Sequence, residues 1–142
     1  MLLLFSEYHL ELTPKTLPEA TNFCNNLGQK LFEPKSLEAD NEVSKLAKAQ
    51  GLTWGPWIGI HDQIIEGNFM YVSSNTTILY ENWNTGEPTN NWRGTDEDCV
   101  IMGLVPGKWY DAPCRKYPVV CENCGKYAVV CEKSGEFTAI ES

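Results

Sequence analysis

Carboxylates are the side chains of this sequence most able to do chemistry, because 19 Asp and Glu residues outnumber 11 Lys and Arg residues. The resulting net charge is -8. Carboxylates that converge repel one another until a cation neutralises them, and their oxygens are hard ligands of the kind that calcium prefers. The same charge opposes binding to nucleic acid and to anionic lipid surfaces. The composition therefore favours a cation as partner, and an acidic surface that is merely solvated is the alternative.

The sequence contains no recognisable catalytic motif. His61 has no neighbouring nucleophile pattern, and the sequence contains no Gly-rich phosphate loop. We therefore predict a binding protein and not an enzyme.

The cysteines predict disulfide bonds. Their number is even, the sequence has two histidines, and the spacing lacks the second Cys pair of a zinc ribbon; the cysteines are Cys24, Cys99, Cys114, Cys121, Cys124 and Cys131. Disulfides persist in oxidising compartments, so we predict a secreted, extracellular protein. Asn75-Thr76-Thr77 is a glycosylation sequon, which weakly supports the same compartment.

The first residues are apolar but do not form a complete targeting signal. Residues 1–7 are short and lack a basic segment, so we interpret them as a remnant of a signal or leader. Elsewhere in the sequence, no apolar run is long enough to cross a bilayer, and we predict no membrane span.

Two helices are predicted to position the reactive residues. Thr16 followed by Glu19 has the form of a capping box, and Gly28 can end the helix that begins there. Apolar residues at helical spacing place Cys24 on the inner face of this helix, together with Leu27. A second helix is predicted over residues 37–50, with its charged residues facing water.

Short strands and one long loop complete the expected elements. β-branched and aromatic residues predict strands at residues 57–60, 68–72, 99–104, 108–110 and 117–121. Residues 81–94 are rich in Asn, Gly, Pro, Thr and Trp and are too long for an ordinary connection, which indicates a functional loop. Trp57, Trp83 and Trp109 are expected in the core.

A tandem repeat lies near the end of the chain. Residues 114–123 are echoed by residues 124–133, and each copy contains Val-Val-Cys-Glu. A solenoid needs at least three stacked units, so we interpret the repeat as a local duplication of a terminal strand.

An ordered series of motifs gives the sequence a family resemblance. The motifs are Glu19-Ala20 before Cys24, Trp57-Ile58-Gly59-Ile60, Glu87-Pro88, Glu97-Asp98-Cys99, Trp109 and Asp111 before Cys114, and Val120-Cys121-Glu122. Together they resemble a C-type lectin domain over residues 8–122, closest in pattern to the mannose-binding proteins. The resemblance implies an α+β fold with two helices, small antiparallel sheets, a long double loop and disulfide bonds. Residues 123–142 would then form a tail that carries the duplicated strand segment.

The resemblance also implies a disulfide pattern. Cys24 would pair with Cys121, and Cys99 with Cys114. Cys124 and Cys131 are left over; they would pair with each other or, alternatively, between chains.

A sugar-binding calcium site is implied at Glu87, Glu97 and Asp111, where sugar hydroxyls would complete the calcium shell. The peptide bond before Pro88 is cis in these lectins. Thr89 stands where mannose-type lectins carry Asn, and its hydroxyl is a candidate calcium and sugar ligand. Tyr110 replaces a second Asn and is expected to pack rather than coordinate, so weaker binding is expected than in the full pattern.

A second calcium site is suggested at Asp62, Glu66 and Asp98, with Glu97 joining them and Asn90 or Asp96 adding an oxygen. The alternative is that Asp62 and Glu66 merely cap a turn.

Trp92 and Arg93 lie in the long loop. Trp92 could stack on the apolar face of a sugar while Arg93 donates hydrogen bonds, although packing of Trp92 in the core is an equal alternative.

The predicted function is calcium-dependent carbohydrate binding. Glu87 favours mannose, fucose or GlcNAc-type ligands over galactose by family analogy. Innate recognition or agglutination would require a homo-oligomer, because linked sites raise the effective concentration of the second binding event. The alternative is a module of the same fold that binds protein, mineral or ice without sugar.

Overall fold

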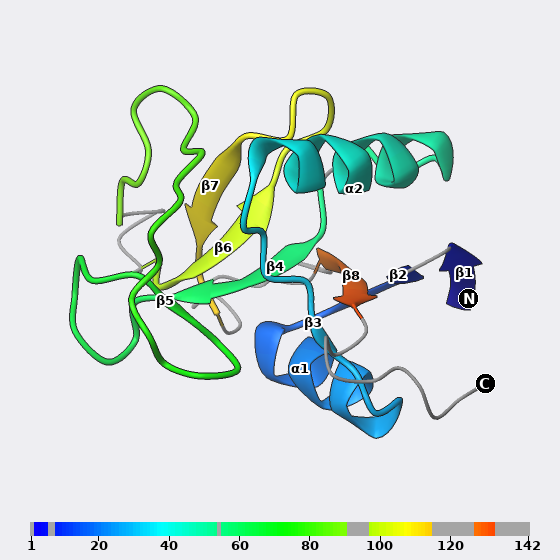
Figure 1. Cartoon of the computed structure of the whole chain (residues 1–142), viewed down its shortest axis with the longest axis horizontal. Coiled ribbons are helices and arrows are strands. Elements are labelled where there is room, and N and C mark those ends of the chain that lie inside the picture. Colours follow the sequence, from blue (N-terminus) through cyan, green and yellow to red (C-terminus); the bar gives the residue numbers. More distant parts are fainter. Residues whose placement is uncertain (1, 6–7, 54, 91–96, 115–126, 133–142) are drawn as a thin grey trace, which may run out of the picture.

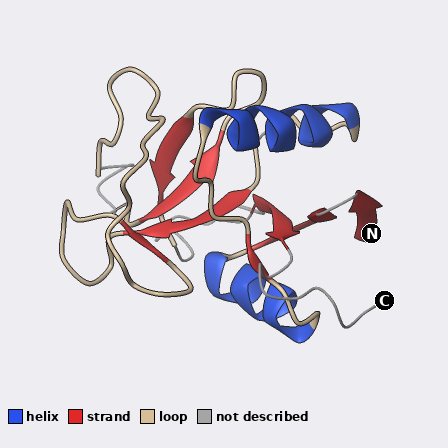
Figure 2. Cartoon of the chain, viewed as in Figure 1, coloured by secondary structure: helices blue, strands red, loops and turns tan. Residues whose placement is uncertain are grey.

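The computed structural model describes residues 2–5, 8–53, 55–90, 97–114 and 127–132. Strands in this part of the chain form one sheet in the order β1-β2-β8-β4-β6-β7, with β3 paired to β8 and β5 paired to β4. Their bounds are β1 Leu2–Phe5, β2 Tyr8–Lys15, β3 Lys30–Leu31, β4 Trp57–His61, β5 Met70–Tyr71, β6 Cys99–Met102, β7 Trp109–Ala112 and β8 Tyr127–Glu132. In Figures 1 and 2, α2 (Leu37–Ala49) and α1 (Leu17–Asn26) lie on opposite sides of the strands, and the long loops gather at one end. The predicted α+β fold with two helices is confirmed.

Strand pairing is antiparallel except where β4 meets β8 in parallel at Trp57 and Val129. All five residues of β4 are buried, as expected for a strand with both faces covered. Gly59 makes this packing possible, because a Cβ atom there would lie 2.8 Å from the Glu33 side chain. The Gly59 N–H instead donates to the Phe32 carbonyl at 2.6 Å. The central strand thus holds the segment after β3 against the sheet.

Helix α1 begins as the sequence predicts. The Thr16 N–H donates to Glu19 Oε1 at 2.9 Å, and the Glu19 N–H donates to the Thr16 hydroxyl at 3.4 Å, which completes the capping box. Cys24 is buried, whereas Leu27 is 38% exposed because it is the C-cap residue, where the helix ends. The prediction that Leu27 lies on the inner face is therefore wrong.

The core is rich in aromatic rings. Trp57 and Trp109 are fully buried, as predicted, and Trp83 is half-buried against Trp109 with ring centroids 5.4 Å apart. Within the described part of the chain, no helix is both long enough and apolar enough to cross a bilayer.

Helix α2 departs from the sequence prediction at Asp40. The carboxylate is fully buried, and its Oδ2 accepts from Tyr80 Oη at 2.8 Å, Asn82 Nδ2 at 3.0 Å and Trp109 Nε1 at 3.1 Å. Burial raises the pKa of Asp40, and these donors oppose the rise. The expectation that every charged residue of this helix faces water is wrong, because Asp40 joins α2 to β7 and to the segment that leads into the long loop.

The C-terminal strand is the second copy of the tandem repeat. Cys131 of β8 pairs with Cys24, so the predicted Cys24–Cys121 and Cys124–Cys131 bonds are wrong. Cys99 pairs with Cys114 as predicted. Cys121, Cys124 and the strand predicted at residues 117–121 lie outside the described residues.

Within the span of β8, the two copies differ at one position. β8 pairs with neighbours on both sides. The first copy carries Pro118 where the second carries Ala128, which is buried. Leu2–Phe5 pairs with β2, and Tyr127–Glu132 lies within the same sheet.

Replacing Asp40 with Ala is expected to lower the free energy of unfolding by about 3 kcal/mol, because buried donors lose their shared acceptor. Urea denaturation measures the change. Glu42→Ala, at an exposed position of the same helix, is the control and should stay within about 0.5 kcal/mol of wild type. An equally small effect for Asp40→Ala would contradict the proposed link between α2 and β7.

Replacing Cys131 with Ser should transfer the disulfide of Cys24 to Cys121, because the first copy repeats the Val-Val-Cys-Glu sequence of β8. Peptide mapping by mass spectrometry under non-reducing conditions detects the new bond. Cys121→Ser should leave the Cys24–Cys131 bond intact. Free, alkylatable Cys24 in the Cys131→Ser variant would show that the first copy cannot replace the second.

Candidate functional site

One cluster of carboxylates lies where β4 ends and β6 begins. Asp62 follows β4 directly, and Asp98 directly precedes β6. The antiparallel pairing of His61 with Cys99 sets these two acids side by side, and the Asp62 N–H donates to the Asp98 carbonyl at 2.9 Å. The register of two strands therefore brings together residues that are distant in sequence.

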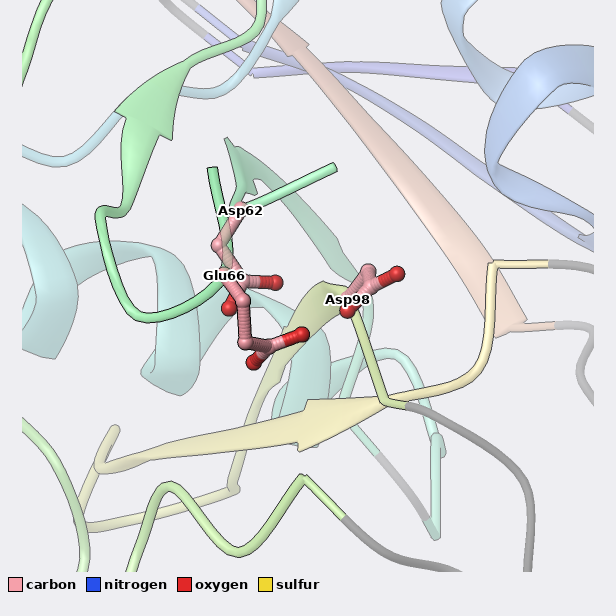
Figure 3. Close-up of side chains that lie close together, drawn as sticks. All are labelled: Asp62, Glu66 and Asp98. Carbon is pink, nitrogen blue, oxygen red and sulfur yellow. The ribbon is translucent and has the colours of Figure 1, made fainter. Parts of the chain in front are cut away.

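Glu66 completes this cluster. One carboxylate oxygen from each of Asp62, Glu66 and Asp98 lies within 4.8 Å of the others. Figure 3 shows the three side chains beside one another. Asp62 is buried, Asp98 is half-buried and Glu66 is exposed. Within the described ranges, no other group of three such side chains meets this condition. We call Asp62, Glu66 and Asp98 the β4–β6 cluster.

The two oxygens of Asp62 have different roles. Oδ2 accepts the Gly67 N–H at 2.9 Å and caps the turn, which requires the left-handed conformation of Gly67 at φ +85°. Oδ1 is buried and has no hydrogen-bond partner among the described residues. A bare buried carboxylate oxygen is costly, and a bound cation would remove that cost. The alternative of a turn cap thus accounts for one oxygen of Asp62 but not for the other.

A second group of carboxylates, Glu87, Glu97 and Asp111, lies around residues 87–90 of the long loop. The Glu87–Pro88 peptide bond is cis, as the resemblance implies. Asp111 of β7 accepts the Thr89 N–H at Oδ1, at 3.1 Å, and the Asn90 N–H at Oδ2, at 2.6 Å. The Asp111 N–H in turn donates to Glu87 Oε1 at 3.2 Å. The strand and the cis-proline turn are therefore tied together through the acids themselves.

Thr89 lies between two of these carboxylates. Its hydroxyl oxygen is 2.5 Å from Glu97 Oε1 and 3.3 Å from Asp111 Oδ1, and its one proton can be donated to only one of them at a time. Glu97 and Asp111 are each 5% exposed. We call Glu87, Thr89, Glu97 and Asp111 the loop cluster.

Burial and mutual repulsion make the loop cluster electrostatically unfavourable. Burial raises the pKa of Glu87 to about 7, with further contributions from its hydrogen bond to the Asp111 carboxyl and from the charges of Asp111 and Glu97. Near neutral pH, Glu87 therefore carries a proton in part of the molecules. A cation that binds these oxygens would replace both that proton and the hydrogen bonds of Thr89.

The other residues predicted for the site belong to neither carboxylate cluster. Asn90, at φ 57°, accepts the Glu97 N–H at its Oδ1 at 3.3 Å, so its amide braces the loop cluster. Tyr110 packs against the core that contains both disulfides, consistent with the expectation that it is not a ligand. Trp92, Arg93 and Asp96 lie outside the described residues.

Sequence reasoning missed the bracing groups around the acids. Backbone N–H groups of Gly67, Thr89 and Asn90 hold Asp62 and Asp111, and motif spacing does not reveal such contacts. Gly67 was the available signal, because a glycine that follows an Asp-containing loop permits the positive φ that an acid-capped turn needs.

Comparison with known proteins gives a consistent result. The sequence profile described as "Lectin C-type domain" matches residues 13–123. Collectin-11 of Danio rerio is 35% identical over 108 residues, which cover 76% of this chain and 38% of that protein. The chain thus spans well under half the length of this curated relative.

Solved structures share the fold. The cow CD23 C-type carbohydrate-recognition domain, determined in the presence of a GlcNAc2Man3 oligosaccharide, has a TM-score of 0.70 and 28% identity, covering 93% of this chain and 92% of that one. Human lithostathine has a TM-score of 0.72 and 22% identity, covering 93% and 87%. A calcium-independent type II antifreeze protein has a TM-score of 0.67 and 23% identity, covering 94% and 91%.

Calcium is expected to stabilise the folded chain through the β4–β6 cluster, because an ion that binds only the folded state raises the free energy of unfolding. At roughly 100 times the dissociation constant, the gain is about 2.7 kcal/mol for one site. Glu66→Gln should remove most of the gain at this cluster, and Glu81→Gln, at an exposed loop position, should not. Scanning calorimetry in calcium and in chelator measures it. Equal calcium stabilisation of Glu66→Gln and wild type would exclude an ion at this cluster.

Proposed function

The chain belongs to the C-type lectin domain family, and we propose that it binds carbohydrate through a calcium ion held at the loop cluster. The observation that carries the proposal is the network beside the cis Glu87–Pro88 bond, in which the Thr89 hydroxyl lies between Glu97 and Asp111 and the Asp111 N–H donates to Glu87. Calcium takes roughly six to eight oxygen ligands, and vicinal sugar hydroxyls can complete a shell that the protein leaves open. Metal binding and sugar binding would then be one coupled event.

The residues of the loop cluster fit calcium in charge and in donor type. The three carboxylates supply hard oxygens, and the Thr89 hydroxyl can add a neutral one through a lone pair. The Asp111 side chain is fixed by N–H donors from the loop, so it would enter the metal shell already oriented. Bound calcium would supply the positive charge that draws sugar hydroxyl oxygens to this loop.

The β4–β6 cluster has a supporting role in the proposal. Asp98 is the residue after Glu97, so calcium beside Asp62, Glu66 and Asp98 would fix the backbone from which Glu97 projects. Occupancy there would stiffen one wall of the sugar site. This arrangement assigns stability to the β4–β6 cluster and ligand binding to the loop cluster.

Sugar class follows from Glu87. A Glu at the position before the cis-proline favours mannose, fucose or GlcNAc-type sugars over galactose by analogy with the family. The oligosaccharide named with the cow CD23 structure contains GlcNAc and mannose, which supports the same class. Trp92 would add apolar contact with the sugar ring. We place the protein outside the cell, consistent with its disulfides, and assign it a binding and not a catalytic role.

Multivalency would determine how tightly the protein binds a surface that carries many glycans. A single shallow sugar site binds weakly, and linked sites gain effective concentration. Recognition of microbial or cell-surface glycans in the manner of agglutinins therefore calls for a homo-oligomer.

A second function, binding of protein, mineral or ice without sugar, is favoured by one observation. The hydrogen bonds among Thr89, Asn90 and Asp111 brace the loop without a cation. Lithostathine and the calcium-independent antifreeze protein show that this fold is shared by proteins whose names do not describe sugar binding. The loop cluster of this chain could be such a self-braced version.

A glycan array distinguishes the two functions. Wild type in calcium should bind a coherent class of mannose-, fucose- or GlcNAc-bearing glycans, and chelator should abolish the signal. Asp111→Asn should lose binding because it removes a charged ligand, while Thr89→Asn should strengthen binding several-fold by supplying a longer amide ligand and donor. Glu81→Gln is the matched control. Folded wild-type protein that leaves the array blank, or binds it equally in chelator, would favour the function without calcium.

A further inference from the structure

A groove separate from both carboxylate clusters lies between the start of α1 and the loop after β4. It encloses about 530 Å³, and none of the β4–β6 or loop cluster residues lines it. Leu17, Pro18 and Ile64 give it apolar walls, whereas Asn22, Gln63 and Asn75 contribute amide groups. Ile64 is 57% exposed, so part of this apolar surface faces solvent. Such a mixture of apolar carbon and amides suits a sugar that carries an N-acetyl group.

Asn75 stands at this groove in a tight turn. Its N–H donates to the Tyr71 carbonyl at 2.8 Å, and the Tyr71 N–H donates to the Thr76 carbonyl at 3.0 Å. Asn75 has φ 53°, a left-handed conformation that Asn tolerates better than most residues. The residue is exposed, and Thr76 and Thr77 after it are exposed as well. The Asn75-Thr76-Thr77 sequon is therefore displayed on the surface by a defined turn.

His61 orients the Asn75 side chain. The Gln63 N–H donates to His61 Nδ1 at 3.1 Å, so the proton of this ring lies on Nε2. Nε2 then donates to Asn75 Oδ1 at 2.9 Å. Because His61 is 5% exposed, this hydrogen bond turns the Asn75 Oδ1 atom toward the protein interior. The Asn75 Nδ2 atom is the one left for a covalent bond.

We propose that Asn75 is an N-glycosylation site and that the first sugar of its glycan covers this groove. The donor is an oligosaccharide linked to a lipid diphosphate. A bond forms between Asn75 Nδ2 and the first GlcNAc C1, the bond from C1 to the diphosphate oxygen breaks, Nδ2 loses one proton, and the lipid diphosphate leaves. The Asn75 Oδ1 atom takes no part, so its hydrogen bond with His61 is compatible with the product.

The groove gives the attached sugar a place to pack. The N-acetyl methyl group and the apolar face of the ring match Leu17, Pro18 and Ile64, and the sugar hydroxyls match the amides of Asn22 and Gln63. Attachment at Asn75 supplies this sugar at very high effective concentration, so even weak contacts suffice to hold it. The occupant of the groove is thus part of the mature protein.

Modification is tested by secretion from a eukaryotic cell line, followed by gel mobility before and after peptide N-glycosidase treatment. Wild type should shift, and the released protein should contain Asp at position 75 by mass spectrometry. Thr77→Ala should not shift, whereas Thr77→Ser keeps the sequon and should. Because Thr77 donates to Asn68 Oδ1 at 3.2 Å, Thr77→Ser also preserves the hydroxyl and separates folding from modification. Secreted wild type of unchanged mobility would overturn the proposal.

Packing of the sugar in the groove is tested by comparing wild-type protein with and without the sugar, so that the two samples have the same sequence. Wild type from the cell line, trimmed by endoglycosidase to a single GlcNAc, is compared with wild type made in the bacterial periplasm, which carries no such glycan. The trimmed protein should melt a few degrees higher and should show slower hydrogen exchange at the first turn of α1. Identical melting and identical exchange would show that the sugar points away from the groove.

Discussion

The antiparallel pairing of β4 with β6, and of β6 with β7, is the constraint on which the candidate site depends. It sets Asp62 beside Asp98 at one end of the strands and places Asp111 opposite Val100. Acids brought together in this way repel one another. Backbone N–H groups offset part of this repulsion: Gly67 donates to Asp62, and Thr89 and Asn90 donate to Asp111. These hydrogen bonds tie the loops to the carboxylates.

The same constraint explains why Thr89 matters. The Thr89 hydroxyl can donate its proton to Glu97 or Asp111 and offer a lone pair to a metal ion, but its side chain has a shorter reach than that of Asn. An Asn would offer a separate oxygen and a separate donor. Because internal hydrogen bonds already brace this loop, we predict weaker calcium binding than in a lectin with Asn at this position.

Local signals in the sequence were sufficient for the helices, and the family resemblance implied the cis bond at Pro88 and the Cys99–Cys114 bond. They failed where a tertiary contact decides the outcome. Asp40 looks like an ordinary exposed acid of a helix, and only the folded chain brings Tyr80, Asn82 and Trp109 to it.

The duplicated strand segment shows a different limit of prediction from sequence. Two copies with the same Val-Val-Cys-Glu sequence satisfy every local criterion, so pattern alone cannot choose between Cys121 and Cys131. The folded chain shows which copy is used, because β8 pairs with β2, β3 and β4 and its Cys131 bonds to Cys24. The sequence motifs were sufficient to predict which acids belong to each of the two carboxylate clusters. The arrangement of the acids within each cluster depends on the strand register, which the motifs do not reveal.

The most direct test of the account is a calcium titration by calorimetry, performed with and without saturating methyl glycosides of mannose, fucose and GlcNAc. If calcium at the loop cluster carries the sugar, one of these glycosides must raise the calcium affinity of one site, because coupling between two ligands is reciprocal. The account predicts two calcium ions per chain, one of them tightened by sugar. Calcium isotherms that no glycoside changes would contradict it.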